Sequence, residues 1–529
     1  MKKYIFTLIY CVIGLSVLAG GIVTNSNQSA GFIRNPAQDA TLGIHAVYYN
    51  PAGLTQLNNG FHLSLNNQFI SQERTVSTSF PGLNQNTFIG DVKAPLFPSV
   101  YAVFKRNKVA VSVGFNPIGG GGSADYQDGL PSFEMQVAAL PGLLSQSGIP
   151  TKDYSYETEF NGSSVYYGLQ GAFTYQVSEV VSLSLGARYV MVDNMYEGYL
   201  RDVRINPIFP PLGYDGSMES APTFFSSMAG LFGNLSGVAE SLQPLVQGGG
   251  GELTLGQAQA LGHLSAEEVA AIAGGFALID PSINPMMLNM AQIQGAYAQA
   301  TPAFEQQQQN MLGYAAATSN KEVEASQSGT GIVPIIGINL NFDALNIGIK
   351  YEHKASIKVK NETKVDDVGL YPDGAEVSND MPAMLAIGAS FDLSERLKLS
   401  AGYHTYFDKD ASYGKMLNNE FVSNDKVIDK NLWEFAMGVD FWLSNKFMLS
   451  AGYLFTETGV MKEYQTDLGH SLSTFSFGGG LLFRASEMID LNLGAMRTFY
   501  SPDVRNFGSY GETYARKALV LAIGLDFHF

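Results

Sequence analysis

The chain ends in the segment Leu519-Val-Leu-Ala-Ile-Gly-Leu-Asp-Phe-His-Phe529. Large apolar residues take every second position from Leu519 to Phe529, and small or polar residues such as Gly524 and Asp526 lie mostly between them. Because successive side chains of a β-strand point to opposite faces, this alternation predicts a strand with one apolar face. A soluble β-sandwich also uses such strands, but rarely as the last residues of an exported chain.

The chain start predicts export. Lys2 and Lys3 precede an apolar stretch, and Ala19 offers a small-residue cleavage site, so we expect a signal peptide over residues 1–19. A retained anchor is the alternative, although the stretch is short for a membrane span of about 20 residues. The only cysteine, Cys11, lies inside this segment, so the mature chain has neither disulfides nor thiolate chemistry.

An exported chain with this last strand resembles bacterial outer-membrane β-barrels, which end on a terminal aromatic that the barrel assembly machinery recognises. No later stretch is apolar enough for a transmembrane helix. A barrel is consistent with this, because its strands alternate lipid-facing and lumen-facing residues and so contain no long apolar run. The net charge of −17 argues against nucleic acid as a partner. The predicted location is therefore the outer membrane, with its lipid as a partner.

Residues 60–529 read as about fourteen strands joined by alternating short and long connections, an even number with the pattern of a transmembrane β-barrel. A hairpin phrase recurs, as Leu399-Ser-Ala-Gly-Tyr403 and Leu449-Ser-Ala-Gly-Tyr453. Its large residues share the lipid-facing parity, and its serine and glycine face the lumen. Arg497 falls on the lipid-facing parity, which indicates either snorkelling to lipid phosphates or a bulge that shifts the register.

The segment before the first strand carries Tyr48-Tyr-Asn-Pro-Ala-Gly-Leu54. Placed before a fourteen-stranded barrel, it resembles the FadL family of outer-membrane transporters for long-chain fatty acids and other hydrophobic compounds. The resemblance implies that residues 20–58 form a hatch that plugs the barrel, with Asn50, Pro51 and Ala52 as its motif, and that the protein is a monomer. The motif's role is expected to be structural, because proline fixes φ and asparagine bonds nearby backbone. A second tripeptide, Asn35-Pro36-Ala37, lacks the flanking residues.

Residues 205–328 lie outside the resemblance and are predicted to be an extracellular insertion with helices. Thr254 with Gln257, and Ser265 with Glu268, fit capping boxes. In the family, helices of the outer loops shape a groove that captures ligand first. Helices that pack on each other and on the barrel rim are the alternative.

Family members release ligand sideways where strand three is kinked. Here strand three breaks into a proline and a run of glycines, which weaken the ladder and leave wall volume empty. The lateral-gate candidates are Phe115, Asn116, Pro117, Gly119, Gly120 and Gly121. The alternative is the flexible start of a long loop over residues 117–162.

A ligand carboxylate in the lumen would favour a cation nearby. Parity places three cations inside the barrel, and the head-group candidates are Arg188, Lys350 and Arg484. Glu352, Glu434, Asp440 and His404 share the interior, so these cations are equally explained as partners of the acids.

No motif for a serine hydrolase, a zinc helix or a phosphate-binding loop is present, so no enzyme, cofactor or metal is predicted. The leading hypothesis is passive uptake of a long-chain fatty acid or a similar hydrophobic small molecule, captured by the outer loops and lumen and released through the wall. An aromatic hydrocarbon, a porphyrin or a bile-acid-like molecule suits such a slot as well. A general diffusion porin, or a structural or adhesin-like barrel, is the alternative function.

Overall fold

The computed structural model describes residues 24–413, 416–417 and 420–529. The predicted signal peptide, residues 1–19, lies outside the described residues. The described residues form two compact units, a barrel unit and a helical unit. No helix among the described residues is long and apolar enough to cross a membrane.

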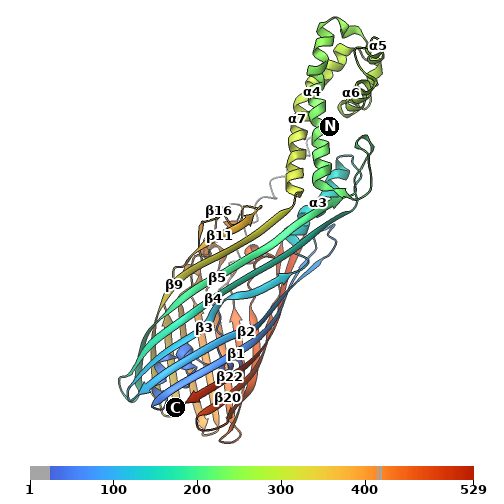
Figure 1. Ribbon diagram of the computed structural model, residues 1–529. Helices are drawn as coiled ribbons and strands as arrows, with labels where there is room; N and C mark the ends of the chain where they lie inside the picture. Colours follow the sequence, from blue (N-terminus) through green and yellow to red (C-terminus); the bar gives the residue numbers. More distant parts are fainter. Residues whose placement is uncertain (1–23, 414–415, 418–419) are drawn as a thin grey trace. The chain divides into compact units, whose positions relative to one another are not determined.

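The barrel unit is a closed antiparallel barrel of 14 strands (Figure 1). The chain end closes it, because β22 pairs with β1 from His62 opposite His528 onward. Leu519, Leu521 and Ile523 are exposed on the outer face, whereas Asp526 is buried inside, so the predicted alternation is confirmed. The wall strands are β1 (Gly60–Thr78), β2 (Thr87–Arg106), β3 (Val109–Tyr126), β4 (Tyr154–Gln176), β5 (Val181–Ile205), β9 (Lys321–Phe342), β10 (Leu345–Glu352), β13 (Met384–Ser394), β14 (Leu397–Tyr406), β17 (Trp433–Trp442), β18 (Phe447–Glu457), β19 (Thr474–Arg484), β20 (Ile489–Tyr500) and β22 (Gly511–His528).

Shorter elements extend this wall. β11 (Lys358–Asp366) pairs with β9 and with β12 (Glu376–Ser378), and β21 (Asp503–Asn506) pairs with β22. Three elements precede the wall, α1 (Ala30–Arg34), α2 (Ala46–Tyr49) and the 3₁₀ helix η2 (Pro51–Gln56). Loops of the unit carry η6 (Asp408–Asp410), α8 (Asn424–Val427) and η7 (Lys462–Tyr464), and β15 (Met416–Leu417) pairs with β16 (Glu420–Phe421).

The helical unit comprises residues 137–157 and 200–320. It covers most of the predicted insertion 205–328, but residues 321–328 belong to β9. Two long helices lie side by side, α4 (Ala221–Gln247) and α7 (Met290–Thr318), around a core that includes Phe276 and Tyr297 (Figure 1). The other elements are α3 (Pro131–Gln146), which begins in the barrel unit, β6 (Ile208–Phe209), η3 (Pro210–Leu212), β7 (Tyr214–Asp215), β8 (Glu219–Ser220), η4 (Gly250–Glu252), α5 (Leu255–Ala260), α6 (Ala266–Ile279) and η5 (Pro285–Met287). Both predicted capping boxes are present.

The register of β20 is unbroken against both neighbours, so no bulge shifts Arg497. The Arg497 side chain remains on the outer face, with its guanidinium 5.9 Å from the ring centroid of Phe499. The bulge is therefore the wrong explanation for this charged residue on the lipid-facing side. Snorkelling toward lipid phosphates is the explanation that remains.

Candidate functional site

Residues 24–57, hereafter the plug, are almost entirely buried within the barrel wall (Figure 1). Strands around the circumference bond to them. From the plug, Ala30 N donates to Asn66 Oδ1 of β1 at 3.1 Å, and Arg34 Nε donates to Asn492 Oδ1 of β20 at 3.2 Å. From the wall, three side chains donate to plug carbonyls: Tyr101 OH of β2 to Gln28 O at 2.9 Å, Gln170 Nε2 of β4 to Val47 O at 2.6 Å, and Lys350 Nζ of β10 to Tyr48 O at 2.7 Å.

Lumen-facing glycines let the plug backbone reach the wall. A Cβ on Gly348 of β10 would lie 2.1 Å from Asp39 O, and a Cβ on Gly402 of β14 would lie 2.1 Å from Asp39 Oδ2. A Cβ on Gly388, Gly438, Gly452 or Gly478 would also lie within 2.5 Å of a plug atom. This contact explains the recurring hairpin phrase, because its two glycines, Gly402 and Gly452, meet Asp39 and Pro36.

Both Asn-Pro-Ala copies anchor the plug. Asn50 Nδ2 donates to Thr41 O at 3.1 Å and to Asn339 Oδ1 on β9 at 2.7 Å. Pro51 opens η2 and its carbonyl accepts from Thr174 Oγ1 of β4, while Ala52 is fully buried. In the second copy, Asn35 Nδ2 donates to Asp440 Oδ2 on β17 at 3.2 Å.

A buried histidine, His404 of β14, also joins the plug to the wall. His404 Nε2 lies 2.6 Å from Asp39 Oδ1 of the plug, and His404 Nδ1 lies 3.0 Å from Glu434 Oε2 on β17. An ionised carboxylate can accept hydrogen bonds but cannot donate them. Both ring nitrogens of His404 therefore donate, and the imidazole is in its charged form. The charged imidazole therefore links two carboxylates, one on each side of the plug–wall contact.

Two of the three predicted head-group cations are saturated by protein acceptors. Arg188 binds Glu352 at 2.6 Å and also Gln170, and Lys350 binds Glu352 at 2.8 Å. Arg484 lies at the strand end next to the β19–β20 turn, 3.5 Å from Asp490, with its guanidinium 5.0 Å from the Trp442 ring centroid. These contacts favour the alternative that the three cations pair with lumen acids.

Within the barrel unit, a cavity of about 410 Å³ borders the first residues of the plug, Thr24 to Asn27. Seven of its lining residues are tyrosines, among them Tyr126, Tyr166, Tyr406 and Tyr500. Gly120, Gly121 and Gly122 of β3 also line it. The cavity therefore reaches from the plug to the barrel wall at β3.

Two arginines that the sequence analysis missed line this cavity, Arg74 on β1 and Arg516 on β22. They lie directly opposite each other in the register of the closing strand pair. Like charges in such positions are destabilising. Among the described residues no carboxylate forms an ion pair with either. Arg74 donates to Gln72 Oε1 and to Gly121 O, while Arg516 Nε is buried without a partner.

His470 lies beside these arginines, in the loop between β18 and β19. Its Nδ1 lies 3.3 Å from Thr466 O and its ring stacks on Tyr514, with 5.1 Å between ring centroids. Nε2 is buried without a hydrogen-bond partner. Burial, followed by the positive charges of Arg516 and Arg74, lowers the pKa of His470 well below its ordinary value. The two arginines and this neutral imidazole form the cation pocket of the cavity.

β3 loses its pairing with β2 at the predicted break but stays paired with β4. The β2–β3 register ends at Val100 opposite Phe115 and resumes only at Asp91 opposite Asp125. Pairing with β4 continues through Pro117, Gly119 and Gly122 with two irregularities. The predicted alternative of a loop over 117–162 is wrong, because β3 runs on to Tyr126 and α3 follows.

The unpaired stretch of β3 finds other hydrogen-bond partners. Asn25 N of the plug donates to Ile118 O at 2.7 Å, Asn25 Nδ2 to Gly120 O at 3.3 Å, and Arg74 Nη2 to Gly121 O at 3.0 Å. On the other side of the gap, β2 carries Pro95 and Pro98, which have no N–H to donate. The plug and Arg74 thus replace β2 as the partner of this stretch.

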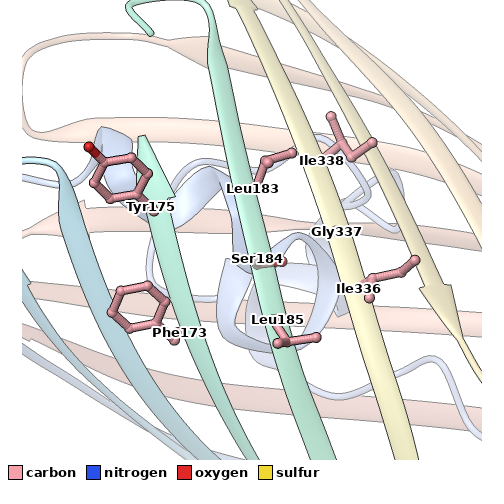
Figure 2. A pocket seen from close by; sticks show the side chains of 8 residues that line it. All are labelled: Phe173, Tyr175, Leu183, Ser184, Leu185, Ile336, Gly337 and Ile338. Atoms are coloured by element: carbon pink, nitrogen blue, oxygen red, sulfur yellow. The ribbon is translucent and has the colours of Figure 1, made fainter. Parts of the chain in front are cut away.

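A second recess, of about 430 Å³, lies on the outer face of the wall (Figure 2). Side chains of β4, β5 and β9 line it, including Phe173, Leu185 and Ile336, and no charged residue contributes. A recess of this composition on the lipid-facing side suits hydrocarbon chains of the bilayer and offers nothing to a polar head group.

No protein-family model matches the sequence, and no curated protein matches it. Solved structures do. A FadL homologue from Pseudomonas aeruginosa has 12% identity over 96% of this chain and 100% of its own, with a TM-score of 0.57. The chain has the FadL fold. The toluene transporter TodX from Pseudomonas putida also has 12% identity, with the same coverage and a TM-score of 0.50. These two FadL-fold proteins are described as a FadL homologue and a transporter, not as enzymes.

Proposed function

We propose that the protein carries a hydrophobic small molecule with an anionic head group, such as a long-chain fatty acid, across the outer membrane. The observation that carries this proposal is the Arg74–Arg516 pair, which faces a tyrosine-lined cavity without an acidic partner among the described residues. A carboxylate between two guanidinium groups forms charge-assisted hydrogen bonds and offsets their mutual repulsion.

The barrel architecture supports transport with a filled lumen. The plug is bonded to strands on all sides, so an open aqueous pore of the porin type is disfavoured, and a ligand in the cavity needs a route that bypasses the plug. The likeness to a FadL homologue and to a toluene transporter supports a hydrophobic ligand. Toluene, the ligand named for TodX, is a neutral hydrocarbon, whereas the arginine pair of this chain favours the anionic class.

We propose that the ligand leaves sideways through the wall where β3 has no β2 partner. Gly120 and Gly121 belong both to the cavity lining and to this unpaired stretch. Arg74 connects the two features, because it donates to Gly121 O while facing the cavity. A carboxylate that recruits Arg74 competes with this carbonyl and loosens β3 at the point of exit.

A substitution at Gly121 tests this exit. A Cβ there would lie 2.8 Å from Arg74 Nη2, the flexible end of a side chain, and Gly121 has no positive φ, so valine is tolerated by the strand. We expect Gly121→Val to displace Arg74, fill the gap and reduce uptake of labelled fatty acid at least about tenfold. Gly120 is a poorer choice, because its φ is +94° and a Cβ would lie 2.1 Å from Ser164 O. Unchanged uptake by a folded Gly121→Val protein would contradict the exit.

The pH dependence of binding tests the cation pocket. An anion between Arg74 and Arg516 offsets the two positive charges that add to burial in lowering the pKa of His470, so this pKa rises and binding takes up a proton. Affinity for an alkyl sulfonate, which stays ionised, should therefore rise as the pH falls below about 6.5, the ordinary pKa of histidine, by at most about tenfold per pH unit. Titration calorimetry measures this slope. In His470→Asn the slope should disappear; an equal slope in both proteins would exclude His470 as its source.

A further inference from the structure

The end of the helical unit where α4 stops and α7 starts exposes a group of large apolar side chains, hereafter the apolar tip: Leu261, Leu278, Ile283, Met286 and Met287. Met287 is 80% exposed and Leu261 is 62% exposed. These residues lie in α6 and η5, directly after α5, or between α6 and η5, and these three elements contact one another. The apolar tip therefore gathers exposed apolar residues from three adjoining elements.

The apolar tip is not required for the core of its own unit. A separate cluster beneath it, which includes Leu255, Ile272 and Phe276, is buried and is completed by Tyr297 of α7. The protein thus keeps large apolar side chains in solvent although the unit is already packed. Exposed apolar groups of this kind indicate a surface that is covered by a partner.

The charge around the apolar tip is of one sign. Residues 205–320 contain neither lysine nor arginine, and their acidic residues are Asp215, Glu219, Glu240, Glu252, Glu267, Glu268, Asp280 and Glu305. Four of these, Glu252, Glu267, Glu268 and Asp280, lie in or next to the elements of the tip. Glu252, Glu268 and Asp280 are oriented by bonds from Asn289, Ser265 and Ser282. Hydrogen bonds from Ser265 lower the pKa of Glu268, and those from Ser282 lower that of Asp280, so both carboxylates are ionised at neutral pH.

This combination excludes two occupants on physical grounds. A second copy that docks through its own tip would bring the same acidic surface against itself, and an anionic lipid surface would be repelled in the same way. A partner with basic side chains next to apolar ones satisfies both features. Methionine, which supplies two of the five tip residues, adapts its shape to varied apolar partners.

We propose that the apolar tip is a docking surface for a cationic amphipathic polypeptide, whose apolar face covers Leu261, Met286 and Met287 while its lysines or arginines meet Glu267, Glu268 and Asp280. This interaction is independent of ligand transport through the barrel. Electrostatic attraction steers the encounter, and burial of the apolar side chains holds the complex.

The test uses the full chain in nanodiscs of zwitterionic lipid and a fluorescent amphipathic helix built of leucine and lysine. Fluorescence anisotropy should show binding that weakens with added salt, and no binding of the same helix with glutamate in place of lysine. Leu261→Ser with Met287→Ser should weaken binding at least about tenfold. Leu312→Ser, an exposed apolar residue of α7 outside the tip, is the matched control and should leave the affinity unchanged.

A second variant tests the acidic residues and combines Glu267→Gln, Glu268→Gln and Asp280→Asn. Glutamine at position 268 preserves the capping box with Ser265, so the helix start is retained. This variant should flatten the salt dependence and weaken binding at low salt. Uptake of labelled fatty acid should be unaffected by the serine and charge variants. Equal affinity of the wild type and the double serine variant, binding of the glutamate helix, or attachment to anionic vesicles instead would overturn the proposal.

Discussion

Gly348→Val is expected to conduct ions steadily in planar bilayers, whereas the wild-type barrel is expected to be nearly silent. A Cβ at this position would lie 2.1 Å from Asp39 O, which is a backbone atom and cannot rotate away. The plug must therefore shift, and the overpacking costs about 1–3 kcal/mol at the plug–wall contact. Single-channel recording measures the conductance, and proteolysis of the plug reports its release.

Gly479→Val is the matched control. Gly479 shares the outward parity of the exposed Phe475 and Phe477 on β19, and a Cβ there would meet nothing closer than Ser450 O at 3.5 Å. Valine suits a strand, so this variant should fold and stay silent. A Gly348→Val barrel with native circular dichroism and no conductance would show that the plug tolerates the intrusion. Steady conductance of the wild type would instead favour the diffusion porin.

Replacing both arginines of the cation pocket is expected to have the second large effect. In Arg74→Gln with Arg516→Gln, affinity for a long-chain carboxylate should fall at least about a hundredfold. Each charge-assisted hydrogen bond contributes about 1.5–3 kcal/mol, and 1.4 kcal/mol corresponds to a factor of ten. The methyl ester of the same acid should bind both proteins alike, because it carries no charge.

Lys517→Gln is the control for this pair. Lys517 neighbours Arg516 on β22 but is exposed on the outer face, where it pairs with Glu73 at 3.0 Å. Its loss changes the net charge without touching the cavity, and binding should be retained. If the double glutamine variant binds the carboxylate as tightly as the wild type, the head-group assignment is wrong. A wild type that prefers the ester would point to a neutral hydrocarbon as the ligand.

The barrel was predictable because its signals are local. The alternation from Leu519 to Phe529 fixes which side chains face lipid, and the recurring hairpin phrase places Gly402 and Gly452 on the lumen side. The anchoring role of Asn50 follows from a short flanked motif. The break at Pro117 was also visible, although Pro95 and Pro98 on β2, which mark the other side of the gap, were a usable signal that the sequence analysis missed.

The cation pocket was not predictable, because it depends on register and on loop folding. Arg74 and Arg516 belong to the first and last wall strands, and only the closing register sets them opposite each other. His470 reaches the cavity from a loop, where strand parity carries no information. Strand parity correctly placed Arg188 and Lys350 on the lumen face. It could not show that both pair with Glu352, which makes them partners of an acid rather than of a ligand head group.

Sideways release with the plug in place is tested most directly by fixing the plug to the wall. A Cβ on Gly337 of β9 would lie 3.6 Å from Ala52 Cβ, within the usual disulfide range of roughly 3.5–4.5 Å. Ser184 Oγ, 2.5 Å from that Cβ, has no hydrogen-bond partner and is free to rotate. Ala52→Cys with Gly337→Cys adds the only cysteines beyond Cys11.

Uptake of labelled fatty acid is then measured in cells or proteoliposomes before and after reduction of this disulfide. If the ligand leaves through the unpaired stretch of β3, the oxidised protein should transport at a rate within about twofold of the reduced one. The reason is that a disulfide at Ala52 does not hold Asn25 or Arg74, so both can still release β3. Transport that stops on oxidation and returns on reduction would mean that the ligand follows the barrel axis past a moving plug, and would contradict the account.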